Sequence, residues 1–284
     1  KTLEEPLTSC RRSIYSFSLC LSGLFLTACA ASIDQIRVPS GTPVIVSEHE
    51  AIWDDLSRPC RSVRSADLVV MFRGYTGQRF FRRTRARAAV KRPGFLRLEG
   101  MAPFGAPAFI LIAKPGHATL LLPRERQVVL DASASDLLYF LSGLSLEPDD
   151  VHALLTGCVI QDGVSLSARG YGDDWVAIDL SGGATVYSRR SGITPVISIG
   201  TLGNLVVEYS EHVRGLPRKL RIQTVDASSP TDLTIELSQV NVNIEINPEA
   251  FEASVPAMFS PVSFDDFQLQ SPTEDRSLAT DGGR

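Results

Sequence analysis

Short runs with β-strand character, separated by Gly or Pro, recur along most of the chain and constrain its fold more than any other feature. They lie at 68–72, 79–90, 95–99, 108–113, 119–122 and 127–130, and again at 164–169, 174–180, 184–189, 204–210, 218–225 and 231–245. Such close spacing predicts an antiparallel meander. Between the two sets, residues 133–143 and 148–157 each have a start signal and a terminal Gly, which predicts two short helices. We therefore expect one large, strongly curved antiparallel sheet with helices between its halves.

Two of these runs are apolar at every position. Phe109–Ile112 and Leu120–Leu122 contain no polar residue, whereas a strand with one face in water alternates between apolar and polar side chains. Both faces of this part of the sheet are therefore expected to avoid water. A tightly packed sandwich explains this pattern as well as a sheet wrapped around an apolar cavity with a helical lid.

The segments that flank the strands are predicted from capping residues. Ser47 followed by Glu50 is a capping box, which predicts a helix over 46–58 that ends at Pro59. An Asn-Pro pair at the start of 247–251 predicts a closing helical turn.

Composition then predicts the domain boundaries. Residues 29–45 are expected to be a tether, residues 46–257 the folded domain, and residues 258–284 an acidic, disordered tail, because apolar residues become scarce there.

The N-terminus carries an export signal. Two arginines precede an apolar run over 14–26, which is too short to span a bilayer of about 30 Å comfortably as a helix and is typical of a secretory signal peptide. The run ends in Leu-Thr-Ala-Cys29, which resembles a bacterial lipobox, in which residues 1–28 are cleaved and the Cys29 thiol is acylated. An ordinary signal peptide that contains a cysteine is the alternative. Since Ala30 rather than Asp follows Cys29, the resemblance implies anchoring in the outer membrane, facing the periplasm.

Two cysteines, Cys60 and Cys158, lie in the predicted folded domain. The periplasm permits disulfides, but the sequence gives no geometry with which to pair these residues. Two separate thiols are our first expectation, and a Cys60–Cys158 bridge is the alternative.

Segment 92–157 has the most specific pattern in the chain. It places a Pro103-Phe104-Gly105 turn between two apolar strands and ends with the two predicted helices. This arrangement resembles the LolB-like family of outer-membrane lipoprotein receptors, and the order of elements is similar over about 45–255. The resemblance implies a mainly β fold, an open half-barrel of antiparallel strands with a helical lid over a hydrophobic cavity.

The resemblance also implies a function. The family accepts acylated lipoproteins from the soluble periplasmic carrier LolA and inserts them into the outer membrane by shielding and transfer, without catalysis. Phe104 has the position of a loop residue that enters the bilayer; Pro103 and Gly105 favour an exposed tip, and a core residue at a turn is the alternative. The implied partners are acyl chains, LolA and outer-membrane phospholipid, for a monomer that needs no cofactor. A structural or lipid-binding lipoprotein of an envelope complex is the alternative function.

Alternation along the strands and helical spacing in the lid predict which side chains line the cavity. The candidates are Leu68, Val70, Phe72, Leu96, Leu98, Phe109, Leu111, Leu137, Leu138, Leu141 and Leu144. Each of them could equally belong to an ordinary core.

Between Asp67 and Glu99 the sequence has nine basic residues and no acidic residue. A solvated strand face that discourages edge pairing is one interpretation, and contact with anionic lipid headgroups is another. Nucleic acid is not an expected partner, because the protein is exported and lacks stacked aromatic residues.

The sequence contains no recognisable catalytic set. Its four histidines are isolated and have no metal-protease spacing, and the Gly163-Val-Ser segment is not a nucleophile elbow. We therefore expect neither an enzyme nor a metal site.

Overall fold

The computed structural model describes residues 34–270 apart from residues 78, 103, 190–194 and 225–229. Residues from Ile36 onward form one compact unit. Within the described part, none of the helices has both the length and the apolar character needed to cross a membrane.

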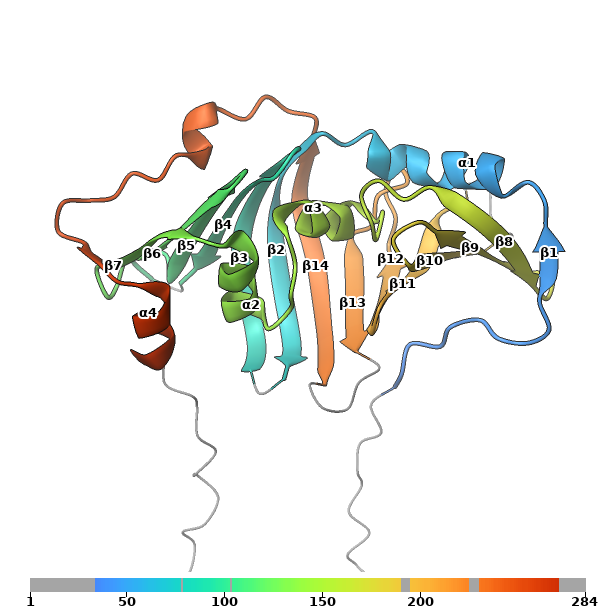
Figure 1. The fold of residues 1–284 in the computed structure, drawn as a ribbon, viewed down its shortest axis with the longest axis horizontal. Helices are drawn as coiled ribbons and strands as arrows, with labels where there is room; N and C mark the ends of the chain where they lie inside the picture. Colours follow the sequence, from blue (N-terminus) through green and yellow to red (C-terminus); the bar gives the residue numbers. More distant parts are fainter. Residues whose placement is uncertain (1–33, 78, 103, 190–194, 225–229, 271–284) are drawn as a thin grey trace, which may run out of the picture. The chain divides into compact units, whose positions relative to one another are not determined.

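The strands of this described part form one sheet of 15 strands, and the sheet does not close on itself (Figure 1). The first meander contains β2 (Ser65–Thr76), β3 (Arg79–Lys91), β4 (Phe95–Met101), β5 (Phe109–Lys114), β6 (His117–Leu122) and β7 (Gln127–Ala132). The second contains β8 (Ser165–Tyr171), β9 (Trp175–Leu180), β10 (Ala184–Arg189), β11 (Ile197–Leu202), β12 (Leu205–Ser210), β13 (Lys219–Thr224) and β14 (Thr231–Val242). β14 pairs with β2 antiparallel, with Ile235 opposite Phe72, and this pairing joins the two meanders.

The chain crosses from one meander to the other through two helices, α2 (Ala134–Ser142) and α3 (Pro148–Thr156), which lie over one face of the sheet, called here the inner face (Figure 1). Ser133 caps α2 by accepting from the Asp136 backbone N–H, and Gly143 ends α2 in the left-handed region at φ 75°. Gly157 ends α3 in the same way at φ 89°. The predicted half-barrel architecture with two helices between its halves is confirmed.

The opposite, outer face is covered at both flanks by the ends of the compact unit. On β5–β7, Ile112, Leu121 and Val128 are buried under Ala253 and Phe259 of the C-terminal segment. On β9–β12, a second cluster is covered by Ile36 and Val38 of the N-terminal segment and consists of Ala177, Tyr187, Ile199 and Val206. The runs that are apolar on both faces are thus explained by a sheet that packs on both sides.

Helix α1 (His49–Arg61) differs from the prediction at both ends. Its N-cap is Glu48, without a side-chain cap, so the predicted capping box at Ser47 is wrong. The helix also continues through Pro59, because Trp53, Leu56 and Cys60 are buried on one side of it and this packing offsets the hydrogen bond that proline removes.

The predicted tether is partly structured as well. Strand β1 (Val44–Val46) pairs with β8 at one edge of the sheet, and Ile36 and Val38 pack on the outer face. The whole of β11 (Ile197–Leu202) is absent from the prediction, because Gly200 and Thr201 interrupt its apolar pattern.

The C-terminal segment has regular structure where the sequence predicted disorder. η1 (Pro248–Phe251) has the predicted Asn247 cap, which accepts from the Glu249 backbone N–H. Beyond it, β15 (Ser260–Pro261) pairs parallel with β7, and α4 (Phe264–Gln270) follows. The disorder prediction is therefore wrong for residues 260–270, and residues 271–284 lie outside the described residues.

Two features hold α4 in place that the acidic composition obscured. Ser263 caps the helix by accepting from the Asp266 backbone N–H at 3.1 Å. Phe267 is buried and its ring lies 4.7 Å from that of Phe140 on α2. The sequence did contain a signal for this helix: a Ser-x-x-Asp cap at 263–266, with two aromatic residues three positions apart at Phe264 and Phe267.

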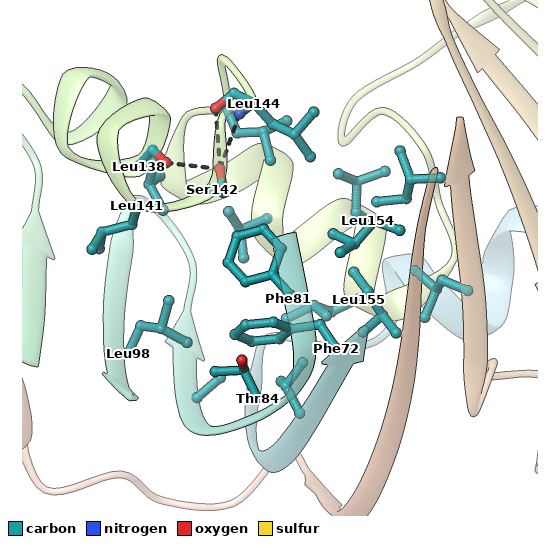
Figure 2. Close-up of a pocket in the computed structure, with 18 of the residues that line it drawn as sticks. Phe72, Phe81, Thr84, Leu98, Leu138, Leu141, Ser142, Leu144, Leu154 and Leu155 are labelled. Carbon is teal, nitrogen blue, oxygen red and sulfur yellow. Dashed lines mark hydrogen bonds between the residues drawn. The ribbon is translucent and has the colours of Figure 1, made fainter. Parts of the chain in front are cut away.

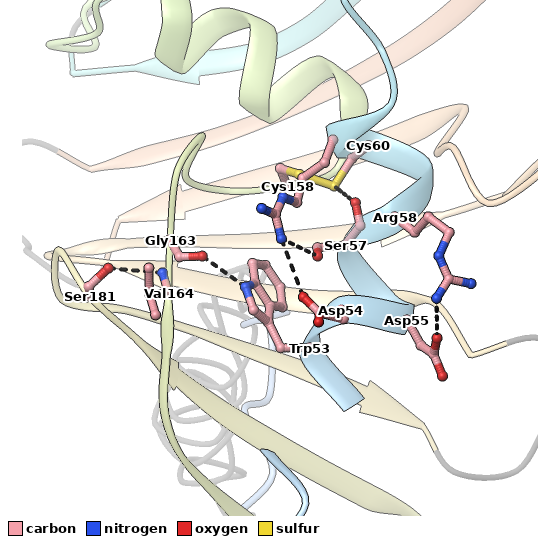
Figure 3. A network of polar contacts seen from close by, with 11 residues as sticks. Trp53, Asp54, Asp55, Ser57, Arg58, Cys60, Cys158, Gly163, Val164 and Ser181 are labelled. Carbon is pink, nitrogen blue, oxygen red and sulfur yellow. Dashed lines mark hydrogen bonds and ion pairs between the residues drawn. A yellow bond between two sulfur atoms is a disulfide. The ribbon is translucent and has the colours of Figure 1, made fainter. Parts of the chain in front are cut away.

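A disulfide joins Cys60 near the end of α1 to Cys158 just after α3 (Figure 3). The first expectation of two separate thiols is therefore wrong. Neither cysteine had a recognisable partner in sequence, because 98 residues separate them. Nearby, the Trp53 Nε1–H donates to the Gly163 carbonyl at 2.8 Å, which fixes α1 to the segment before β8 (Figure 3).

Candidate functional site: an apolar cavity under a helical lid

A cavity of about 160 Å³ lies between the inner face of the sheet and the helices α2 and α3 (Figure 2). Its walls are apolar except for Thr84 and Ser142. The strands contribute Val70, Phe72, Phe81, Thr84, Ala88, Leu98, Phe109, Leu220, Ile222, Leu233 and Ile235. The helices and their connection contribute Leu138, Leu141, Ser142, Leu144, Leu146, Val151, Leu154 and Leu155. The Ser142 hydroxyl donates to the Leu138 carbonyl at 2.7 Å, so its polarity is satisfied within the lid.

The structure divides the eleven candidate cavity residues into two groups. Those that line the cavity are Val70, Phe72, Leu98, Phe109, Leu138, Leu141 and Leu144. Those that belong to the buried core and do not line it are Leu68, Leu96, Leu111 and Leu137. The lining residues of β13 and β14 were not among the predicted cavity residues, although Leu220 and Ile222, like Leu233 and Ile235, occupy alternate positions that point to one face.

Aromatic rings shape the strand side of the cavity. Phe72 on β2 and Phe81 on β3 meet edge to face, with ring centroids 5.5 Å apart. The Phe109 ring on β5 lies across Gly100 of β4, where a Cβ atom would overlap the ring. A side chain at position 100 would therefore displace the Phe109 ring from its place beside the cavity.

The lid is fastened more firmly at α3 than at α2. The disulfide holds the chain just after α3, and the Asp149 carboxylate near the start of α3 accepts from the Gly94 backbone N–H at 2.9 Å. By contrast, among the described residues the end of α2 is held by the hydrogen bond from the Thr76 hydroxyl to the Ser142 carbonyl and by apolar contacts such as that of Phe140 with α4. Among the described residues, α2 thus has fewer covalent and polar attachments to the rest of the domain than α3 has.

One buried polar pair lies at the base of α3. His152 Nδ1 and Gln161 Oε1 are 3.0 Å apart, and both side chains are buried. Burial lowers the pKa of His152 below its ordinary value, and the hydrogen bond to Gln161 opposes this only in part. His152 therefore stays neutral at neutral pH and supports α3 as a structural residue.

The loop between β4 and β5 presents an aromatic residue to solvent. Phe104 is 89% exposed. Gly105 beside it has a positive φ of 79°, which residues with a side chain rarely adopt. Pro103 and the proposed lipid-anchor Cys29 lie outside the described residues. The structure thus places Phe104 at the surface of the loop, away from any core.

Within the described residues, no group of three or more His, Cys, Asp or Glu side chains could hold a metal ion. None of the described residues that line the cavity is ionisable, so its walls are suited to enclose apolar matter.

No family model and no curated protein sequence matches this chain. Solved structures do show a similar fold. The LolA superfamily protein NE2245 from Nitrosomonas europaea is similar over 72% of this chain and 97% of its own, with a TM-score of 0.50 and 10% sequence identity. A DUF1329 family protein from Desulfovibrio piger is similar over 73% of this chain and 98% of its own, with a TM-score of 0.49 and 12% identity. The chain therefore shares its fold with NE2245.

Proposed function

We propose that this protein is a lipid-anchored receptor of the bacterial envelope that shields acyl chains of lipoproteins in its cavity and delivers them to the outer membrane. The observation that carries the proposal is the apolar cavity that lies between the sheet and the helices α2 and α3. The fold shared with a LolA superfamily protein supports it, as does the lipobox resemblance around Cys29.

The energetic need for such a cavity is large. Each methylene group moved out of water contributes about 0.8 kcal/mol, so an acyl chain of about 15 methylenes exposes roughly 12 kcal/mol of unfavourable apolar surface. A lipoprotein with two or three chains cannot cross an aqueous gap in that state. Release needs no covalent chemistry, because a bilayer solvates the chains at least as well as the cavity does.

The cavity must open before it can accept a whole chain. Its volume is about 160 Å³, and a cavity of about 150 Å³ holds one benzene molecule. An acyl chain has more than twice as many carbon atoms as benzene. We infer that α2 moves away from the sheet during loading, since in the described part of the chain its end is held by the Thr76–Ser142 hydrogen bond and by apolar contacts, without a covalent link.

Transfer of a radiolabelled acylated lipoprotein from its carrier to liposomes tests the proposal, with the chain from residue 30 onward as acceptor. Wild-type protein should transfer the lipoprotein. Ala88→Leu, which places a larger side chain in the cavity, should lower the amount bound, and Phe104→Glu should allow loading but slow release into the liposomes.

Leu166→Glu is the matched control for the loop variant, because Leu166 is an apolar residue on β8 that is 62% exposed. The Leu166→Glu variant should transfer the lipoprotein normally. If folded wild-type protein with the carrier from the same organism transfers nothing, the receptor proposal is wrong. The structural or lipid-binding lipoprotein of an envelope complex then becomes the better hypothesis.

A further inference from the structure

We propose that the outer face of the β2–β3 hairpin docks on an anionic phospholipid bilayer. We call this surface the basic hairpin face and define it by Arg73, Phe80, Arg82, Arg83 and Arg85, all on the outside of the domain. The inference deepens the proposed function, since it assigns the side of the receptor that approaches the membrane and the lipid class that it recognises.

The arginines of β3 fall into two groups. Arg87, nearer the middle of the sheet, is neutralised by Asp67, with Nη2 and Oδ2 2.9 Å apart. In the described part of the chain, Arg82, Arg83 and Arg85 make no ion pair with a carboxylate, although the Arg83 Nε–H contacts the Met71 sulfur. Uncompensated positive charge is therefore concentrated toward the hairpin end of the strand.

Acidic residues on the same face are already engaged or set apart. Asp232 on β14 forms a two-pronged pair with Arg221, with distances of 2.9 and 2.8 Å. Glu236 on β14 stands opposite Met71 and is the acid closest in register to Arg85. Glu208 on β12 lines the same outer hollow as Arg73 and Arg82. Two carboxylates, Glu208 and Glu236, thus face four arginines, and the basic hairpin face keeps a net positive charge.

An exposed aromatic residue accompanies these arginines. Phe80 is 67% exposed at the start of β3. Protein segments on a membrane surface combine apolar side chains such as Phe, which enter the interface, with cations that reach the anionic headgroups. Since β4 pairs antiparallel with β3 and ends at Met101 opposite Arg85, the loop that carries Phe104 leaves the sheet at this same end.

The N-terminal segment reaches the sheet in the same row of residues. The Ile36 backbone N–H donates to Gln223 Oε1 at 2.7 Å. Gln223 stands opposite Asp232, Asp232 opposite Tyr75, and Tyr75 opposite Phe80. Three steps between neighbouring strands separate Gln223 from Phe80, about 15 Å.

The short segment between Cys29 and Ile36 limits the distance between the domain and a lipid anchor at Cys29. Seven residues lead from Cys29 to Ile36, and they can span at most about 25 Å. A lipidated Cys29 would therefore hold Ile36, at one end of this row of residues, within about 25 Å of the bilayer surface. Charge, aromatic exposure and tether position then favour a bilayer over a soluble anion or an acidic protein as the occupant.

The test is flotation of the chain from residue 30 onward with vesicles of phosphatidylcholine alone or of phosphatidylcholine mixed with phosphatidylglycerol. Removing residues 1–29 leaves the compact unit that begins at Ile36 intact. The variant Arg82→Gln/Arg83→Gln/Arg85→Gln should bind anionic vesicles about 100-fold more weakly, at roughly fivefold for each cation. Added salt should weaken wild-type binding in the same direction.

The matched control replaces three arginines that precede β2, at the end of this strand away from the hairpin. Arg58→Gln/Arg61→Gln/Arg64→Gln changes the net charge equally, but these residues lie on α1 or just after it (Figure 1), and binding should fall much less. Phe80→Ser should lower binding to both kinds of vesicle by about tenfold, as expected for a partly buried aromatic ring.

Three results would overturn the proposal: equal binding to neutral and anionic vesicles, equal losses in both triple variants, or normal vesicle binding by the hairpin variant with lost affinity for an acidic protein carrier. Because flotation measures docking and not transfer, a receptor that docks but transfers nothing would refute the proposed function alone. A receptor that transfers without anionic preference would refute this inference alone.

Discussion

The disulfide between Cys60 and Cys158 gives the most quantitative prediction. It closes a loop with a sequence separation of 98 residues, and the chain-entropy relation gives about 4.7 kcal/mol of stabilisation for a loop of about this size. Ordinary domains are stable by about 5–15 kcal/mol, so the loss would be a large fraction of the total. We expect Cys60→Ala/Cys158→Ala to lower the free energy of unfolding by about 4 kcal/mol. Alanine is chosen because both sites are buried and a serine hydroxyl would need a partner.

The assay is equilibrium unfolding in urea, followed by tryptophan fluorescence. Trp53 is a suitable probe because it is buried on α1 and bonded to the Gly163 carbonyl. Reduced wild-type protein should unfold at nearly the same urea concentration as the double variant, and reductant should not destabilise the variant further. A loss below about 1 kcal/mol would contradict the chain-entropy reasoning and would mean that packing of α1 alone holds the two segments together.

Two further predictions concern the lid. Phe267→Ala should destabilise the contact between α4 and α2, by about 3 kcal/mol for a buried aromatic residue, and hydrogen exchange of the α2 amides should accelerate; unchanged exchange in α2 would show that α4 does not support the lid. His152 should make stability depend on pH, because burial lowers its pKa in the folded protein. Below about pH 6.5 the unfolded chain binds a proton that the folded protein excludes, so stability should fall as the pH decreases from there and stay level above it. His152→Phe should flatten this part of the urea-midpoint profile, and an unchanged slope would assign the dependence to other groups such as His212, whose pKa burial also lowers.

The sequence by itself determined most local structure. Ser133 and Gly143 delimit α2, and Gly157 ends α3, because each provides a hydrogen bond or a positive φ that the backbone requires there. Short runs between Gly and Pro residues located most strands of both meanders, since alternation and turn residues act over a few positions.

The candidate site was only partly accessible in this way. Alternation places Val70 and Phe72 on one face of β2, and both line the cavity. Alternation also places Leu68 on that face, yet Leu68 lies in the packed core. A face is fixed by the two-residue period, whereas a residue's position along the strand relative to the lid depends on how the helices cross the sheet.

Tertiary structure alone decided the features that join distant segments. The Cys60–Cys158 bridge, the pairing of β14 with β2, and the burial of Phe267 against Phe140 link residues far apart in sequence. Helix α1 continues past Pro59 for the same reason, because contacts made by its buried side outweigh the local signal to stop. A local pattern can specify which face of an element is apolar, but the partner that covers that face is selected only when the whole sheet assembles.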